Sequence, residues 1–279
     1  MQKIVPVSKK NHQKSFFYKI EGLNSNFENF RSMSNCPIVI DEVKSVAGEF
    51  PIVFKKNSEN RFYLSCIFSL LKDVNPFVNQ EKHWNGGYIP VFFRVHPFLL
   101  AYSENKKDKV LCFLQDSTSI SNKKGQGFHS FFDKELNLSK ELSSTFKLLQ
   151  LVEENKIITQ KALDSLDKFK ILQEWPIEIK ADDSKSENIR IEGWHKIDEK
   201  KLKSLSSNDL KILNQNRSLE IAYSQLISIP KLNHIVNLHT DARNIENSTK
   251  SLRDRTIDKQ KKEKKLELDE LVQNLFDID

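Results

Sequence analysis

The residues best suited to chemistry lie in one stretch, residues 84–98, which is rich in aromatic side chains and carries two adjacent glycines, one arginine and one histidine. Gly86 and Gly87 would let the backbone approach a ligand closely. No phosphate-binding glycine loop follows them. The chemistry that this stretch could perform is binding, because Arg94 beside aromatic rings can stack on them or hold a carboxylate through two hydrogen bonds.

β-rich composition predicts a strand over Tyr88–Arg94, and strand alternation divides the stretch into two faces. One face, which includes Val91 and Phe93, is apolar throughout and is typical of a core. The other face is amphipathic and is the candidate surface for a ligand or partner. The competing interpretations are a plain turn at the glycines and an Arg94 that pairs with an acidic neighbour for structural reasons. The candidate surface consists of Trp84, Gly87, Tyr88, Pro90, Arg94 and, at the end of a later strand, Asp116.

Other chemistries find little support in the sequence. None of the seven histidines forms a His-x-His or His-x-x-x-His pair, so we expect no metal site, and we expect no cofactor. The three cysteines include no Cys-x-x-Cys pair and have apolar neighbours, which indicates buried thiols in a reducing compartment. Cys112 could pair with His96 or His129 as a nucleophile, but its apolar setting favours burial. There is no Gly-x-Ser-x-Gly elbow.

Charge and hydropathy exclude further classes of protein. The chain has 279 residues, with 44 basic and 38 acidic side chains and a net charge of +6 spread along its length, so there is no strong nucleic-acid signal. No run of 18 apolar residues predicts a membrane span. The segment Met1–Val7 lacks the apolar run of a signal peptide, which predicts a cytoplasmic protein.

Two hairpins are expected within an antiparallel β unit at residues 36–116. The first joins Phe50–Phe54 to Arg61–Phe68 across a polar turn, and the second joins Phe98–Tyr102 to Lys109–Leu114. A short strand is expected between Ser15 and Ile20. This unit must position the aromatic stretch, which lies between the two hairpins.

Residues 137–238 are expected to be mostly helical, because the hydrophobic period changes there from two to about 3.6. Ser139 should cap one helix and Thr159 a second, and Asp198 and Ser206 should cap later ones. Pro230 should interrupt the last helical run. A second small hairpin is expected from strands at 175–180 and 188–194. The later helices are expected at 199–205, 207–215, 218–229 and 231–238.

The last forty residues change in character. From residue 239 the chain carries 9 basic and 10 acidic side chains and no aromatic before Phe276. We expect a charged helical extension at 239–279, with 240–279 available for homo-oligomer formation, beside a domain at 1–238. The fold class is therefore α+β: an N-terminal antiparallel β unit, then helices with a second small hairpin, and a helical C-terminal tail.

An ordered set of motifs resembles the SapC-like family, bacterial proteins named for an association with surface layers. The first run is Cys36–Val43 followed by Phe50–Phe54. Gly87–Pro90 and Arg94–Phe98 follow, with His96 where an aromatic is more usual. The other matching segments are Cys112–Asp116, Gly193–Leu202 and Leu219–Ile229. The resemblance covers residues 15–238.

The resemblance implies a soluble accessory or binding protein linked to surface-layer or envelope processes, and so allows a surface association. It supplies no catalytic residues. The partner, a protein or a small molecule, is not identified. The alternative is an enzyme, or an enzyme's helper, that modifies a small molecule or a side chain in an aromatic pocket with Arg94 binding an anionic group. A third interpretation makes the tail an interaction module.

Overall fold

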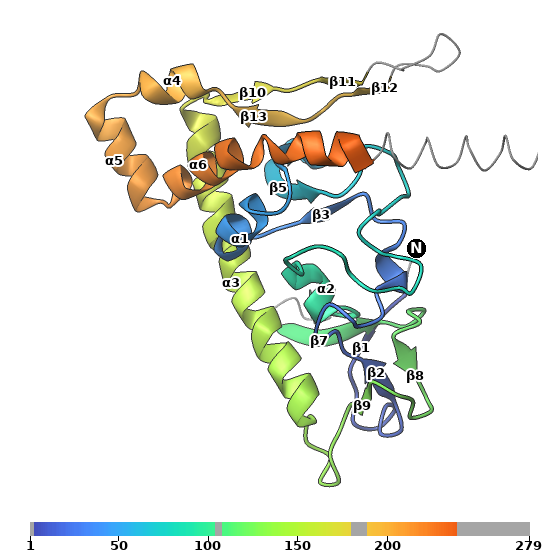
Figure 1. Ribbon diagram of the computed structural model, residues 1–279. Coiled ribbons are helices and arrows are strands. Elements are labelled where there is room, and N and C mark those ends of the chain that lie inside the picture. The colour runs from blue at the N-terminus through green and yellow to red at the C-terminus, as the bar shows by residue number, and fades with distance from the viewer. Residues whose placement is uncertain (1–2, 104–107, 180–188, 239–279) are drawn as a thin grey trace, which may run out of the picture. The chain divides into compact units, whose positions relative to one another are not determined.

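The computed structural model describes residues 3–103, 108–179 and 189–238. The chain divides into a compact unit, Met1–Ile235, and a second unit, Val236–Asp279. The elements below belong to the first unit, except for the last three helical residues, 236–238, and the predicted boundary after residue 238 stays a prediction. The unit contains antiparallel sheets in its N-terminal half and mainly helices in its C-terminal half (Figure 1), which is the α+β fold that the sequence predicts.

The largest sheet has five strands in the order β10-β13-β4-β5-β3, and every pairing in it is antiparallel. Its centre is the predicted hairpin. Asn57 Oδ1 closes the turn of that hairpin by accepting hydrogen bonds from the backbone N–H groups of Glu59 and Arg61. The strands are β3 (Asn35–Pro37), β4 (Ile52–Lys56), β5 (Phe62–Ile67), β10 (Leu172–Glu174) and β13 (His195–Ile197). The sheet therefore joins the N-terminal half of the unit to its C-terminal half.

The second predicted hairpin forms a separate three-stranded sheet in the order β1-β7-β6, and its two strands have the bounds that alternation predicts. A third sheet, in the order β8-β2-β9, contains the strand expected near residues 15–20. A two-stranded extension continues the C-terminal hairpin. These strands are β1 (Ile4–Pro6), β2 (Phe16–Tyr18), β6 (Phe98–Tyr102), β7 (Lys109–Leu114), β8 (Ile120–Ser121), β9 (Phe128–Ser130), β11 (Ile177–Ile179) and β12 (Ile189–Ile191).

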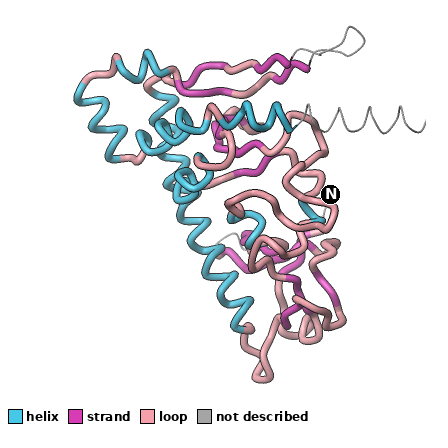
Figure 2. The backbone as a smooth tube through the Cα atoms, viewed as in Figure 1, coloured by secondary structure: helices cyan, strands magenta, loops and turns pink. Residues whose placement is uncertain are grey.

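One long helix, α3 (Lys140–Lys168), packs against strands of all three N-terminal sheets, as Figures 1 and 2 show. Ser139 caps it as predicted, because the Ser139 hydroxyl accepts from the backbone N–H of Leu142. The predicted second helix starting at Thr159 is wrong. Thr159 lies inside α3, where its hydroxyl donates to Asn155 O at 2.6 Å and accepts from the backbone N–H of Ile40 at 2.9 Å. Thr159, which the sequence predicts as a helix cap, thus makes a tertiary hydrogen bond from the middle of a helix.

The C-terminal helices begin where the capping residues predict. Asp198 caps α4 (Glu199–Lys203) and Ser206 caps α5 (Ser207–Gln215). Helix α6 (Ser218–Ser228) is followed by a turn at Pro230 and by helical residues 231–238. The short helices of the N-terminal half are η1 (Glu28–Phe30), η2 (Ile40–Glu42), α1 (Val43–Ala47) and α2 (Val91–Val95), of which η1 and η2 are 3₁₀ helices.

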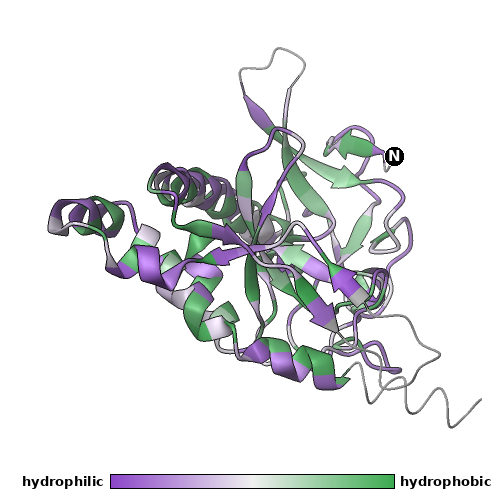
Figure 3. Cartoon of the chain, turned by 90° about the horizontal axis from the view of Figure 1, so that it is seen from above, coloured by the Kyte–Doolittle hydropathy of each residue, from purple (hydrophilic) through white to green (hydrophobic). Residues whose placement is uncertain are grey.

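Phenylalanines fill much of the core. Figure 3 shows hydrophobic residues, in green, along many of the strands. Seven phenylalanines are less than 2% exposed: Phe17, Phe27, Phe50, Phe54, Phe68, Phe93 and Phe131. Their rings meet mostly edge to face, as between Phe17 and Phe98, whose centroids are 4.9 Å apart. Buried phenylalanine therefore offsets a modest aliphatic content.

Candidate functional site

The aromatic stretch is not the strand that its composition predicts. Pro90 is the N-cap residue of α2, so Val91–Val95 form one short helix. Helical geometry separates two residues that strand alternation places together. Phe92 is partly exposed and lines a cavity, whereas Arg94 turns toward Tyr88. Val91, Phe93 and Val95 are buried as expected, because the rest of the core surrounds this helix.

The side chain that fixes this helix is Glu42, which is only 4% exposed. Its Oε1 accepts hydrogen bonds from the backbone N–H of Val91 at 2.6 Å and from the Tyr88 hydroxyl at 2.9 Å. Its Oε2 accepts from the backbone N–H of Val39 at 3.2 Å. Burial raises the pKa of Glu42, although these hydrogen bonds act in the opposite direction. Glu42 therefore ties the segment before α1 to the start of α2.

Tyr88 and Arg94, predicted on one face, are in contact. Arg94 Nη2 donates to the Tyr88 hydroxyl at 3.4 Å, and the guanidinium carbon lies 5.9 Å from the Tyr88 ring centroid. Burial, together with the charge of Glu42, raises the pKa of Tyr88, so its hydroxyl stays protonated near neutral pH and donates to Glu42. Arg94 Nε is buried without a hydrogen-bond partner. Whether this arginine binds an anionic ligand stays a prediction.

Three other residues of the candidate surface shape the backbone before α2. Trp84 is buried against Phe27 at a centroid distance of 5.5 Å, and its Nε1 donates to Tyr88 O at 2.9 Å. Gly87 lies against the Glu49 carboxylate so closely that an added Cβ would come within 2.6 Å of Oε1. Pro90 is buried at the helix start. Their recorded contacts are with the protein itself, and a role in binding stays a prediction.

Asp116 lies apart from Tyr88 and Arg94 in its contacts. It is exposed just beyond β7, and its Oδ2 accepts from the backbone N–H of Lys3 at 3.4 Å. The neighbouring Ser117 has the closer link to the aromatic stretch, since its Oγ lies 2.9 Å from His96 Nε2. The structure thus brings together Trp84, Tyr88 and Arg94, while Asp116 contacts a different part of the chain.

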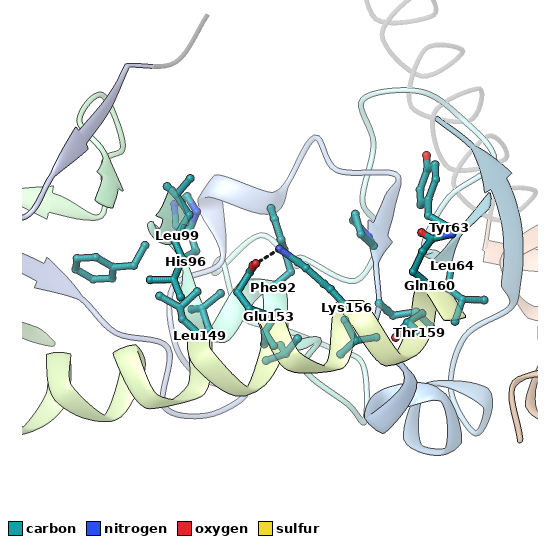
Figure 4. A pocket seen from close by; sticks show the side chains of 18 of the residues that line it. Tyr63, Leu64, Phe92, His96, Leu99, Leu149, Glu153, Lys156, Thr159 and Gln160 are labelled. Atoms are coloured by element: carbon teal, nitrogen blue, oxygen red, sulfur yellow. Dashed lines mark hydrogen bonds and ion pairs between the residues drawn. The ribbon is translucent and has the colours of Figure 1, made fainter. Parts of the chain in front are cut away.

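A cavity borders α2 at Val91, Phe92 and Val95, and Arg94 does not line it. Its volume of about 670 Å³ is within the size range of small-molecule sites. Figure 4 shows how its lining side chains converge between α3, α2, β6 and β5. Val39 and Val91, the two residues whose backbone N–H groups bind Glu42, both belong to its wall. Glu42 and the groups that bind it, which we call the Glu42 network, therefore connect two segments of the cavity wall.

One face of α3 forms the long side of the cavity. The lining positions run from Leu149 to Leu163, so the cavity extends about 21 Å along the helix axis. The spacing follows the helical repeat, which keeps all these side chains on one face. They are Leu149, Val152, Glu153, Lys156, Thr159, Gln160 and Leu163. An elongated ligand matches this shape better than a compact one.

The two ends of the cavity differ in polarity. We call one end the β6 arm, and it is lined by Phe98, Leu99, Leu100, Leu114 and Leu149. We call the other end the β5 arm, and it is lined by Asn57, Tyr63, Leu64, Thr159 and Gln160. Apart from His96, which lies beside Leu99 in Figure 4, the β6 arm is lined by hydrocarbon side chains, whereas the β5 arm is mixed. Phe92, Glu153 and Lys156 lie between the two arms in Figure 4.

Three charged side chains, which we call the charged rim, meet beside α3. Lys156 Nζ lies 2.6 Å from Glu153 Oε1, and Lys109 Nζ binds Glu153 Oε2. The Glu153 side chain is 18% exposed and that of Lys156 60% exposed. The rim therefore carries one more positive than negative charge, and both of its lysines are accessible to solvent.

His96 supplies a partly buried imidazole at the β6 end of the cavity. Its ring packs edge-on against Phe30 at a centroid distance of 5.1 Å, and Nε2 contacts Ser117 as described above. Burial lowers the pKa of His96 to about 4, so the imidazole is neutral at physiological pH. It can accept or donate one further hydrogen bond but does not attract an anion by charge.

Sequence reasoning missed the α3 side of this site. The helix start that the sequence predicts at Thr159 divides this face, so that Leu149 and Val152 fall in one helix and Gln160 and Leu163 in another. A continuous 3.6-residue repeat from Leu149 to Leu163 was the signal that could have found the cavity wall.

Cysteine and metal chemistry add no second site within the residues that the structure describes. The three cysteines are buried free thiols, as their apolar neighbours predict. Cys36 and Cys66 are direct partners across β3 and β5, and burial raises the pKa of the Cys36 thiol. In the described ranges no group of three or more His, Cys, Asp or Glu side chains is placed to hold a metal ion. Nor is any described helix long and apolar enough to cross a bilayer.

Comparison with known proteins decides the family. The SapC family model matches residues 8–235. The chain belongs to the SapC family. Searches of curated proteins and of solved structures gave no match. In this SapC-family protein the matched region includes the Glu42 network, the cavity and its charged rim, whereas the charged extension at 239–279 lies beyond it.

Proposed function

We propose that this SapC-family protein is a binding protein that takes an apolar small molecule, or the apolar part of a larger one, into the cavity between α3, α2 and β6. The observation that carries the proposal is the cavity itself: about 670 Å³, lined mainly by aliphatic and aromatic side chains. Filling it would remove apolar surface from water on both partners, at roughly 25 cal/mol per Å². A link to surface-layer or envelope processes belongs to the same proposal and rests on the family name.

The enzyme alternative rests on a different feature, the partly buried Arg94 beside Tyr88. Its support is the Arg94 Nε atom that has no hydrogen-bond partner and could serve an anionic group. Arg94 is not among the residues that line the cavity. Binding in the cavity and binding at Arg94 are therefore separable by mutation, which makes the two functions experimentally distinct.

Fluorescence titration with the neutral apolar dye N-phenyl-1-naphthylamine tests the proposal. Val152→Phe fills the cavity from α3, while Leu151→Phe adds a ring to the same helix at a position that is 54% exposed. We expect Val152→Phe to weaken dye binding about tenfold or more, equivalent to about 1.4 kcal/mol, and Leu151→Phe to leave it unchanged. Circular dichroism would confirm that both variants are folded.

Arg94→Ala completes the comparison. The cavity proposal expects this variant to keep the affinity of the unmodified protein for the dye. Absence of saturable dye binding by the unmodified protein would overturn the proposal. So would a dye affinity that falls in Arg94→Ala and not in Val152→Phe, and that result would favour the Arg94 face as the binding site.

A further inference from the structure

The lining of the cavity shows where a ligand must place its polar atoms. Most polar side chains of the wall already have partners within the protein. The Thr159 hydroxyl is bonded to both Ile40 and Asn155, and Gln160 Nε2 donates to Asp164 Oδ1 at 2.7 Å. His96 Nε2 is engaged with Ser117. A ligand whose polar groups were spread along its length would leave several of them buried and unpaired, which is costly.

Two lysines of the charged rim have donors to spare: Lys156 lines the cavity, and Lys109 binds the lining residue Glu153 without being part of the lining itself. A lysine ammonium has three N–H donors, and both Lys109 and Lys156 use Glu153 as their carboxylate partner. Two cations therefore share one anion. A second carboxylate placed at Lys156, the lysine that lines the cavity, would complete the charge balance and accept charge-assisted hydrogen bonds. A cationic group there would instead compete with two lysines for Glu153.

The distance from the rim to the hydrocarbon end indicates a chain-like ligand. Lys156 and Leu149 are seven residues apart on one face of α3, about 10 Å along the helix axis. From Leu149 the β6 arm continues past Leu99 and Leu100 toward Leu114. A linear hydrocarbon chain could follow this apolar path, and its polar end would then lie at Lys156.

We propose that the ligand is an aliphatic carboxylate, with its hydrocarbon chain in the β6 arm and its carboxylate at Lys156, where this lysine lines the cavity beside Glu153. This inference rests on the proposed function and adds the head-group charge and the orientation of the chain. It names a chemical class that includes free fatty acids and other molecules with a terminal carboxylate on an unbranched chain.

Three probes with the same twelve-carbon chain test the head group: dodecanoate, dodecan-1-ol and dodecyltrimethylammonium. Each is titrated against the dye complex of the full-length protein, below its micelle concentration. We expect dodecanoate to displace the dye at about tenfold lower concentration than dodecan-1-ol, and the ammonium compound to be the weakest. Added salt should reduce the advantage of dodecanoate, because it screens the exposed lysines.

Lys156→Ala, with Lys161→Ala as its matched control on an exposed turn of α3, tests the orientation. We expect Lys156→Ala to bring the dodecanoate affinity down to that of dodecan-1-ol, with the alcohol unaffected. Lys161→Ala should change neither. Equal binding of the acid and the alcohol by the unmodified protein, or a preference for the ammonium compound, would overturn the carboxylate inference and leave the proposed function standing. If the protein bound neither the dye nor any of the probes, the proposed function itself would fall.

Discussion

Glu42 is the residue on which the geometry of the aromatic stretch depends. Replacing it with alanine would leave the buried backbone N–H groups of Val39 and Val91 without acceptors. We expect Glu42→Ala to lower the free energy of unfolding by about 3 kcal/mol, because each unsatisfied buried donor costs about 1–3 kcal/mol. Urea denaturation followed by circular dichroism measures the change.

Two other variants define that prediction more closely. Tyr88→Phe removes the hydrogen bond to Glu42 and the long 3.4 Å contact with Arg94, and it should cost about 1 kcal/mol. Glu59→Ala, in the exposed turn of the first hairpin, should be close to neutral. If Glu42→Ala proved no more destabilising than Glu59→Ala, the carboxylate would not be holding α2 in place.

His96 gives the stability a defined pH dependence. Its folded pKa of about 4 lies below the unfolded value of about 6.5, so the unfolded state binds more protons between these values. The stability that comes from keeping His96 neutral in the folded state is therefore fully present above about pH 6.5 and is lost as the pH falls toward 4. The difference in stability between His96→Gln and the unmodified protein should change across this window by at most about 3 kcal/mol. Parallel stability curves for the two proteins from pH 4 to 7 would contradict the assignment.

Helix α6 holds two strands of the five-stranded sheet through buried polar side chains. Gln225 Oε1 accepts from the backbone N–H of Ile197 in β13, and Gln225 Nε2 donates to Ile52 O in β4. Ser228 Oγ accepts from the backbone N–H of Ile52. Together the two residues attach the C-terminal hairpin and the N-terminal hairpin to one helix.

We expect Gln225→Leu to destabilise the protein by about 2–4 kcal/mol, because it leaves a donor and an acceptor buried without partners. Ile227→Ala on the same helix is the control, since Ile227 is 67% exposed and its loss should cost less than about 0.5 kcal/mol. Thermal unfolding of both variants provides the measurement. Similar midpoints for Gln225→Leu and the unmodified protein would show that α6 is held by apolar packing alone.

Elements whose signals are local could be predicted from the sequence. Ser139, Asp198 and Ser206 cap helices through bonds to residues three positions away, so composition alone locates those helix starts. Elements decided by distant contacts could not. Val91 receives its hydrogen-bond acceptor from Glu42, 49 residues away, and the alternation of Val91, Phe93 and Val95 is equally compatible with a strand. The Thr159 hydroxyl accepts a hydrogen bond from the backbone N–H of Ile40, 119 residues away in the sequence. No local sequence pattern predicts this contact.

The candidate site followed the same rule. The sequence identifies the stretch that borders the cavity but predicts that Tyr88 and Arg94 form its binding face. That prediction assumes a strand, in which Phe92 would lie on the same face as Tyr88 and Arg94. In the helix, Phe92 lines the cavity and Arg94 joins the network behind its wall. The facing wall comes from α3, some sixty residues further along the chain, and only the folded chain brings Lys156 to Phe92 (Figure 4).

At the scale of the whole molecule, the cavity and the residues that support it belong to the family region. Every cavity-lining residue lies between Pro37 and Leu163, and Glu42 lies there as well. The family match ends at residue 235, and the compact unit ends at the same place. A chain that stops after residue 238 retains every described contact on which the site depends. We therefore expect it to fold and to bind N-phenyl-1-naphthylamine with unchanged affinity.

The same truncation tests the proposed role of residues 240–279 in assembly. If the extension joins copies of the chain, light scattering should find fewer chains per particle in the shortened protein while its dye affinity stays the same, because the two properties reside in different parts of the chain. An unchanged number of chains per particle would show that the extension is not the assembly element. A loss of dye binding in a protein that still unfolds cooperatively would contradict the assignment of the site, since it would mean that residues beyond 238 complete the cavity.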